Sequence, residues 1–376
     1  MTDSYTDKLD KRSLSLLRLA QAMIRDTGNQ ALEAAYKAAR SAAYELDNSP
    51  TTQTVFNKMM REMVKAYDEA IQQALEPLTD EMNQVAVSEA AWTYTLMTKY
   101  APDVAFAEPV NAKVIKYAQS SMLSMTSGGV KQAFTWSDYV DRYFSEVSSR
   151  IKSAINGVWL QGVQSGNLPS LRQYTSAVQT LTNGVNKIEL EKIIRTGVTS
   201  FSTNGRLAFR DDNLDVIERE VPVVTFDNRT SDICISVAAN YGEKGWKVGK
   251  SPVGYPPYHP LCRTGISFIA MGQRIDGTRQ VVVAGDKDAF EARKANLRTK
   301  SQVTRRGNND EALIGKEIAA STPIAKHLRS QPDWFIKDTL GATRGQAFID
   351  GKLDLRTLTT DKLKPKTIAE LNLEEV

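Results

Sequence analysis

The feature that most constrains the fold is a long apolar stripe at helical spacing in the first third of the chain. Apolar residues recur there every three or four positions, which places them on one face of a helix. The stripe consists of Val55, Phe56, Met59, Met60, Met63, Val64, Tyr67, Ile71, Ala74 and Leu75. A helix with such a face must bury it, either in a helical bundle or against a partner helix. We expect Pro50 and Pro77 to end helices on either side of the stripe.

Similar periodicity recurs around this stripe, so residues 1–186 are predicted to form a helical N-terminal region. Two segments of low charge, 101–113 with its prolines and 120–129 with its Ser, Met and Gly, interrupt the pattern, and we expect them to be irregular. From residue 188 a further helical pattern contains Gly197 and Gly205. Each glycine is unfavourable in a helix interior by about 1 kcal/mol. The two glycines therefore indicate either close packing against another backbone or a break in the helix.

Most of the reactive side chains lie in one stretch, residues 224–269. It contains both cysteines of the chain, Cys234 and Cys262, and one of the two histidines, His259. Apolar, β-branched runs at its two ends predict short strands. The long loop between them is uncommon in a compact domain unless it is functional or tied down. The predicted fold class is α+β: a helical N-terminal half, a small strand-containing module with a long Cys/His loop, and a short helical C-terminal tail.

A metal ion is one candidate for what ties the loop. His259 and Cys262 stand in the sequence His-Pro-Leu-Cys, a spacing that lets both side chains face one ion, and Cys234 can approach from the other end of the loop. The ion would be a structural zinc, with Asp227, Asp232 or a water as the fourth ligand. A disulfide between the two cysteines is an alternative, although the cytosol disfavours it during synthesis. Packing of two buried thiols is another.

The sequence offers little material for catalysis. It contains neither a phosphate-binding GxxxxGK[ST] motif nor a dinucleotide-binding GxGxxG after a strand, and no HExxH. A Cys/His nucleophile requires an imidazole that a third group orients. Glu218, Glu220 and Glu243 lie near the loop but belong to no motif. We therefore expect a protein without enzymatic activity and predict no catalytic or cofactor-binding residues.

A hydrophilic span at 286–325 is predicted to be a basic linker or arm. The chain as a whole carries a net charge of +4, which permits contact with nucleic acid or an acidic surface without requiring it. Six basic side chains are candidates for contact with DNA or a protein partner: Arg293, Lys294, Arg298, Lys300, Arg305 and Arg306. A solvated linker is the alternative interpretation. Residues 326–376 regain an apolar pattern and are predicted to form a C-terminal helical hook.

The chain shows no secretory signal at its start and no apolar run of membrane-spanning length, so we expect a protein made in the cytosol. Two cysteines in a chain of 376 residues argue against a disulfide framework.

Three segments carry a resemblance to a known family. They are RTGVTSFSTNGRLAFRDDN at 195–213, FDNRTSDIC at 226–234 and PPYHPLCRTGI at 256–266. The motif residues around the Cys/His set are Arg195, Thr196, Asp227, Arg229, Thr230, Pro257, Pro260 and Arg263. Together these segments resemble the conserved block of the phage head morphogenesis proteins, the Mu F-like minor head proteins of tailed bacteriophages. Ser231 departs from the pattern, because some members have a second cysteine there.

The resemblance implies a minor capsid protein that resides in the phage head and is assembled in the host cytoplasm. Such a protein associates with the portal vertex and supports head assembly and DNA packaging or ejection. Its expected partners are the portal protein and the major capsid or scaffold proteins, with non-specific DNA as a further candidate and no membrane. Residues 187–285 would form the Mu F-like module, with Arg229 and Arg263 holding its loop through hydrogen bonds.

Two alternatives stay open. One is an internal protein that is ejected with the genome. The other is a nucleotide-dependent transferase of the ADP-ribosyltransferase type, because some relatives carry such a domain fused to the module. The Arg, Ser-Thr-Ser and Glu-x-Glu set of those transferases is not seen in the sequence.

Overall fold

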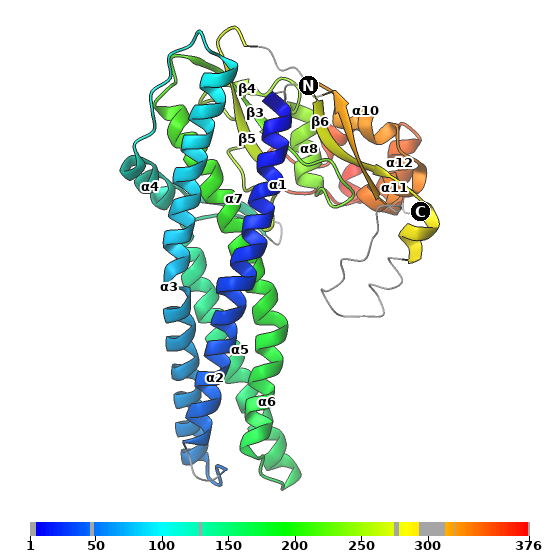
Figure 1. Ribbon diagram of the computed structural model, residues 1–376. Helices are drawn as coiled ribbons and strands as arrows, with labels where there is room; N and C mark the ends of the chain where they lie inside the picture. Colours follow the sequence, from blue (N-terminus) through cyan, green and yellow to red (C-terminus); the bar gives the residue numbers. More distant parts are fainter. Residues whose placement is uncertain are drawn as a thin grey trace.

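The computed structural model describes residues 5–45, 49–127, 130–273, 278–292, 313–319 and 321–374. The protein is α+β, as predicted: long helices run side by side as a bundle, and a smaller mixed module packs at one end of it (Figure 1). The bundle and its flanks contain α1 (Tyr5–Met23), α2 (Asn29–Tyr44), α3 (Gln53–Tyr100), α4 (Asn111–Ser120), α5 (Trp136–Ser165), α6 (Leu171–Leu181) and α7 (Lys187–Asp211). Single π-helical turns, Ile24–Gly28 and Thr182–Asn186, join α1 to α2 and α6 to α7.

The bundle is built around α3, whose apolar stripe is buried for most of its length, although Val55 at its start is exposed. Phe56, Met59, Met63, Tyr67 and Ile71 are fully buried. Helices α2, α5 and α7 pack against α3 and supply the rest of this core. The prediction of a bundle is thereby confirmed for the stripe.

The expected helix end at Pro77 is wrong, because α3 runs unbroken from Gln53 to Tyr100 through this proline. A proline inside a helix removes the hydrogen bond to the carbonyl four residues earlier. Pro77 and that residue, Gln73, both lie on the exposed face, where water can bond to the carbonyl. Leu75 and Leu78 are buried on the opposite face. Packing on the inner face therefore offsets the defect on the outer one.

The prediction of irregular segments at 101–113 and 120–129 is confirmed for residues 101–110 and wrong where α4 and β1 form. Helix α4 begins at Asn111, and β1 (Leu123–Ser127) pairs antiparallel with β2 (Val130–Phe134) in a hairpin. Val114 of α4 and Leu123 are buried in the bundle core. Short elements of this kind depend on tertiary packing more than on intrinsic propensity, so their composition did not indicate them.

Helix α7 is unbroken, and its glycines mark close packing rather than a break. A Cβ at Gly205 would lie 2.1 Å from the carbonyl oxygen of Ala86 in α3. A Cβ at Gly197 would lie 2.5 Å from the ring of Trp136 in α5. The two helices therefore approach α7 at distances that only glycine allows.

The module contains a three-stranded antiparallel sheet. Its central strand is β3 (Ile217–Val223), which lies between β4 (Trp246–Lys247) and β5 (Gly265–Ala270). Strands β3 and β5 confirm the two strands expected at the ends of the long loop. The loop is not without regular structure, however, because it also forms α8 (Asp232–Tyr241).

The rest of the module forms a second hairpin and the helical C-terminal tail. Strand β6 (Thr278–Ala284) pairs antiparallel with β7 (Leu313–Ala319). The tail contains α10 (Ile324–Arg329), α11 (Asp333–Leu340), α12 (Ala342–Ile349) and short 3-10 turns at Leu355–Thr357 and Ala369–Leu371. Side chains of α8, the Cys/His loop and these helices share one apolar core.

Helix α7 connects the bundle to the module. Its first half contributes to the bundle core, while Leu207 and Phe209 join a second apolar cluster with β3, β5 and the start of α1. The boundaries expected at residues 186, 285 and 325 stay predictions. The six basic side chains between Arg293 and Arg306 lie outside the described residues. Among the helices that the structure describes, none is both long and apolar enough to span a membrane.

Candidate metal centre

The structure brings Cys234, His259 and Cys262 together. Their potential ligand atoms all lie within 4.8 Å of one another. The Cys234 sulfur lies 3.2 Å from His259 Nε2 and 3.7 Å from the Cys262 sulfur. A tetrahedral zinc ion with Zn–S bonds of about 2.3 Å separates two sulfur ligands by about 3.8 Å. These three side chains could hold a metal ion, and the sulfur-to-sulfur distance suits zinc.

Local sequence explains how each sulfur reaches the cluster. Cys234 lies in the first turn of α8, and Ser231 caps that helix by accepting the Cys234 backbone N–H at 3.2 Å. Cys262 closes a tight turn, in which its backbone N–H donates to the His259 carbonyl at 3.1 Å. Leu261 in this turn has a φ of 62°. This left-handed conformation is unfavourable for a residue with a side chain, so other contacts must hold the turn.

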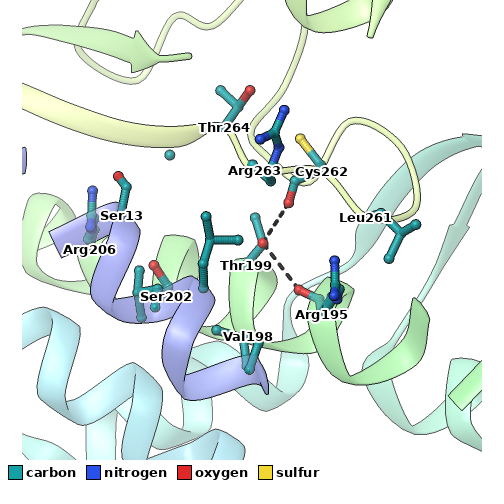
Figure 2. A pocket seen from close by; sticks show the side chains of 14 residues that line it. Ser13, Arg195, Val198, Thr199, Ser202, Arg206, Leu261, Cys262, Arg263 and Thr264 are labelled. Atoms are coloured by element: carbon teal, nitrogen blue, oxygen red, sulfur yellow. Dashed lines mark hydrogen bonds between the residues drawn. The ribbon is translucent and has the colours of Figure 1, made fainter. Parts of the chain in front are cut away.

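Helix α7 supplies those contacts. The Leu261 N–H donates to Thr196 Oγ1 at 3.1 Å, and Thr199 Oγ1 donates to the Cys262 carbonyl at 2.7 Å. Figure 2 shows Thr199 between Cys262 and the carbonyl of Arg195, one turn earlier in α7. The left-handed turn that carries Cys262 is therefore fixed to the helix that also packs in the bundle.

The imidazole of His259 is held so that one ring nitrogen faces the sulfurs. Its Nδ1 lies 2.7 Å from the Pro260 carbonyl, which can only accept, so Nδ1 donates this hydrogen bond. Metal-binding histidines commonly have such an outer partner, which fixes the ring orientation. In addition, Thr264 Oγ1 donates to the Cys234 sulfur at 3.1 Å. The Thr264 contact favours the Cys234 thiolate, and the Pro260 contact leaves Nε2 of His259 facing the sulfurs.

Both thiols of the cluster are buried and His259 is partly buried, and the two thiols are electrostatically different. The pKa of Cys234 is raised, because its thiol hydrogen-bonds to Cys262 and because it is buried. Burial also acts to raise the pKa of Cys262, yet that pKa is lowered, because Cys234 and His259 hydrogen-bond to the thiolate. Burial acts to lower the pKa of His259, but contact with Cys262 raises it. The Cys262 sulfur is thus stabilised as the thiolate, the form that binds metals.

The two aspartates expected as a fourth ligand are not in this group, which corrects that prediction. Asp227 forms two bonds with Arg263, at 2.5 and 2.7 Å, and Asp232 bonds to Arg344 at 2.8 Å. Burial acts to raise the pKa of Asp227, but the hydrogen bonds and charge of Arg263 outweigh burial, so this pKa lies below its ordinary value. Each carboxylate is therefore committed to a guanidinium instead of an ion.

Most of the motif residues hold the segments around the cluster. Asp227 accepts the Arg229 N–H at 2.9 Å and donates its own N–H to Thr230 Oγ1 at 3.1 Å, while Thr230 Oγ1 donates to the Thr225 carbonyl at 2.6 Å. The Arg263 side chain holds the loop as predicted, whereas Arg229 contributes its backbone N–H and its side chain is exposed. Pro257 is buried two residues before His259.

Arg195 lines a small pocket rather than contacting the sulfurs. The pocket lies between α1, α7 and the loop at 261–265, and Figure 2 shows Arg195, Thr199 and Cys262 along it. Ser13 of α1 is on the opposite wall.

A buried ion-pair network joins the bundle to the strand that follows Cys262. Glu89 of α3 is fully buried and binds Arg206 of α7, whose Nε lies 2.8 Å from the carboxylate, as well as Arg12 of α1. Arg206 also donates to the Ile266 carbonyl of β5 at 2.8 Å. Glu220, named as a candidate acid, is likewise buried and paired with Arg210. These carboxylates have structural partners.

Sequence reasoning missed several residues of the site. Thr199 and Thr264 belong to no motif, although Thr199 follows Thr196 at a spacing that places both on one face of α7. Ser231 drew notice only as a missing cysteine. Its spacing of three residues from Cys234 could have indicated that both side chains lie on the same turn.

Comparisons of the sequence with protein-family models and with curated proteins, and of the structure with solved structures, find no match.

Proposed function

We propose that this chain is a minor capsid protein of a tailed-phage head. In this proposal it associates with the portal vertex and supports head assembly and DNA packaging or ejection. The cluster of Cys234, His259 and Cys262 is a structural zinc site that clasps its module. The function is binding and assembly, without turnover.

One observation carries this proposal: the residues that resemble the head morphogenesis motif converge on one cluster. They come from three segments separated in sequence, and they meet as hydrogen-bond partners or neighbours. Thr196 holds the turn of Cys262, Arg263 binds Asp227, and the potential ligand atoms of the Cys/His side chains lie within 4.8 Å of one another. A motif whose members stabilise one another in this way supports a structural role for the module.

Zinc is the ion that the ligand chemistry favours. Two sulfurs and an imidazole are the ligand types that zinc prefers in structural sites, and a reducing cytosol keeps the thiols available. Cys234 and Cys262 are both free and buried. The residues would hold the ion and thereby fix α8 to the turn that α7 supports.

Metal analysis of the purified full chain, combined with a thiol count, tests the zinc site. We expect one zinc per chain, with both thiols protected until a chelator is added. The Cys262→Ser variant should lose the metal, whereas Ser170→Gly, at a helix N-cap in the distant α5–α6 turn, should keep it. Absence of metal with two reactive thiols in the wild-type protein would contradict the site.

Replacement of the gene in the phage genome that carries it tests the assembly role. His259→Ala should yield few infectious particles and heads that lack the protein, as measured by plaque assay and mass spectrometry. Lys250→Ala, an exposed change in the same loop, serves as the control. Normal heads containing the parental amount of the His259→Ala protein would exclude an essential role of the clasp.

A further inference from the structure

A fourth atom lies at the Cys/His cluster, the hydroxyl oxygen of Ser231. It is 2.8 Å from His259 Nε2, the same nitrogen that lies 3.2 Å from the Cys234 sulfur. The imidazole nitrogen has a single in-plane position for a proton or an ion. The Ser231 oxygen and the Cys234 sulfur both lie at this position. A cation placed there could be bound by the oxygen, the sulfur and the imidazole nitrogen together.

The helix geometry keeps Ser231 at this place. Ser231 is the N-cap of α8 and Cys234 is three residues further on, so both side chains lie on the same turn and face the same way. The Cys234 N–H occupies one lone pair of the Ser231 oxygen, at 3.2 Å. A hydroxyl oxygen has two lone pairs, so the second is available to a cation.

Charge balance also favours a neutral oxygen here. Cys234 and Cys262 are only 4% and 1% exposed, so an unbalanced charge in the cluster would be costly. Two thiolates neutralise a divalent cation, and a neutral imidazole and hydroxyl leave the total at zero. The nearby charges of Arg263 and Asp227 already neutralise each other.

We infer that Ser231 is the fourth ligand of the metal ion, which is held by two thiolates, one imidazole and one neutral oxygen. This inference rests on the proposed zinc site and replaces the aspartate ligands expected from the sequence. An oxygen ligand without charge is released more easily than a thiolate. The site therefore exchanges its ion, unlike a site closed by three cysteines and one histidine.

Cobalt in place of zinc gives a direct readout in the full-length chain. Ser231→Cys should raise the thiolate-to-cobalt charge-transfer absorption by about half, because three thiolates replace two. It should also slow the transfer of cobalt to a chelator. Ser231→Gly removes the oxygen at a position where glycine is tolerated as an N-cap. Its cobalt affinity should fall at least by about tenfold, the loss that even an outer-sphere partner causes.

Two further variants separate ligation from helix capping. Ser231→Thr keeps the hydroxyl and should restore affinity, whereas Ser170→Gly makes the same change at the N-cap of α6 and should have no effect. Equal affinities for wild type and Ser231→Gly, with unchanged absorption in Ser231→Cys, would overturn the serine ligand and leave the zinc site intact. A wild-type chain that binds no cobalt would overturn both, whether or not Ser231→Cys binds it.

Discussion

Between Phe56 and Met82, the buried side chains of α3 are apolar, whereas the Cys/His cluster is surrounded by short polar contacts from Thr196, Thr199, Thr264 and Ser231. Apolar burial is non-directional and tolerates small shifts. Hydrogen bonds and metal ligands depend on position to within a few tenths of an ångström. The bundle is therefore specified by a repeating pattern, and the module by individual residues.

The largest effect on stability is expected where the bundle meets the module, at the buried pair of Glu89 and Arg206. Glu89→Ala leaves Arg206, whose side chain is only 3% exposed, without its carboxylate partner. Breaking a buried pair by removing one partner costs about 3–5 kcal/mol. Chemical denaturation should show this loss in the free energy of unfolding. Glu33→Ala removes an exposed partner of Lys37 and should change the free energy by less than about 0.5 kcal/mol. Similar losses of unfolding free energy in both variants would show that burial does not determine the strength of the Glu89–Arg206 pair.

The next effect tests close packing within the bundle. Gly205→Ala places a Cβ against the Ala86 carbonyl and should destabilise the protein by about 3 kcal/mol, the upper end for overpacking. Gly157→Ala in α5 meets no atom within 4 Å and should stabilise it by about 1 kcal/mol. Thermal unfolding of the two variants measures the contrast. A melting temperature that rises for both would contradict the packing of α7 on α3.

A smaller, pH-dependent effect belongs to the module. Arg263 holds the pKa of Asp227 below its ordinary value, so its contribution is complete above about pH 4 and is lost as the pH falls through the lowered pKa. Asp227→Asn should therefore cost about 2 kcal/mol at pH 7, the scale of charged hydrogen bonds, and progressively less below pH 4. Denaturation at both pH values checks this. Asp354→Asn, which breaks the more exposed pair with Arg356, is the control and should cost less at pH 7. If the loss of unfolding free energy in Asp227→Asn were the same at both pH values, the assignment would be refuted.

The smallest effect isolates one hydrogen bond. Thr199→Val keeps the side-chain shape but removes the donor to the Cys262 carbonyl, and it should cost about 1 kcal/mol. Thr95→Val removes only a bond to the Ala91 carbonyl on the exposed face of α3 and should be nearly neutral. Hydrogen exchange of the Cys262 and Gly265 amides should be faster in Thr199→Val alone. Unchanged exchange would mean that Thr199 does not hold the turn.

The same contrast explains what could be predicted from the sequence. The stripe of α3 and the strands β3 and β5 follow from period and composition, and their burial agrees with those predictions. Pro77 was misjudged because its cost depends on solvent at Gln73, a tertiary property. The short α4 and the β1–β2 hairpin carried no clear period.

The site was predictable in its ligand types but not in its partners. Cys234, His259 and Cys262 share one stretch, so their residue types alone indicated a cluster. Asp227 and Asp232 have the right chemistry, but their arginine partners lie 36 and 112 residues away. Pairings at such separations are set by the three-dimensional fold, and local sequence does not encode them.

The length of α3 has a mechanical consequence. At 1.5 Å per residue, its 48 residues form a rod about 70 Å long that begins at the far tip of the bundle and ends beside the module (Figure 1). A tilt of about 5° at the module end would displace the tip by about 6 Å, more than a helical turn. A rigid rod of this kind would convert a small tilt where Leu96 and Met97 pack on the sheet of the module into a much larger displacement at the far tip.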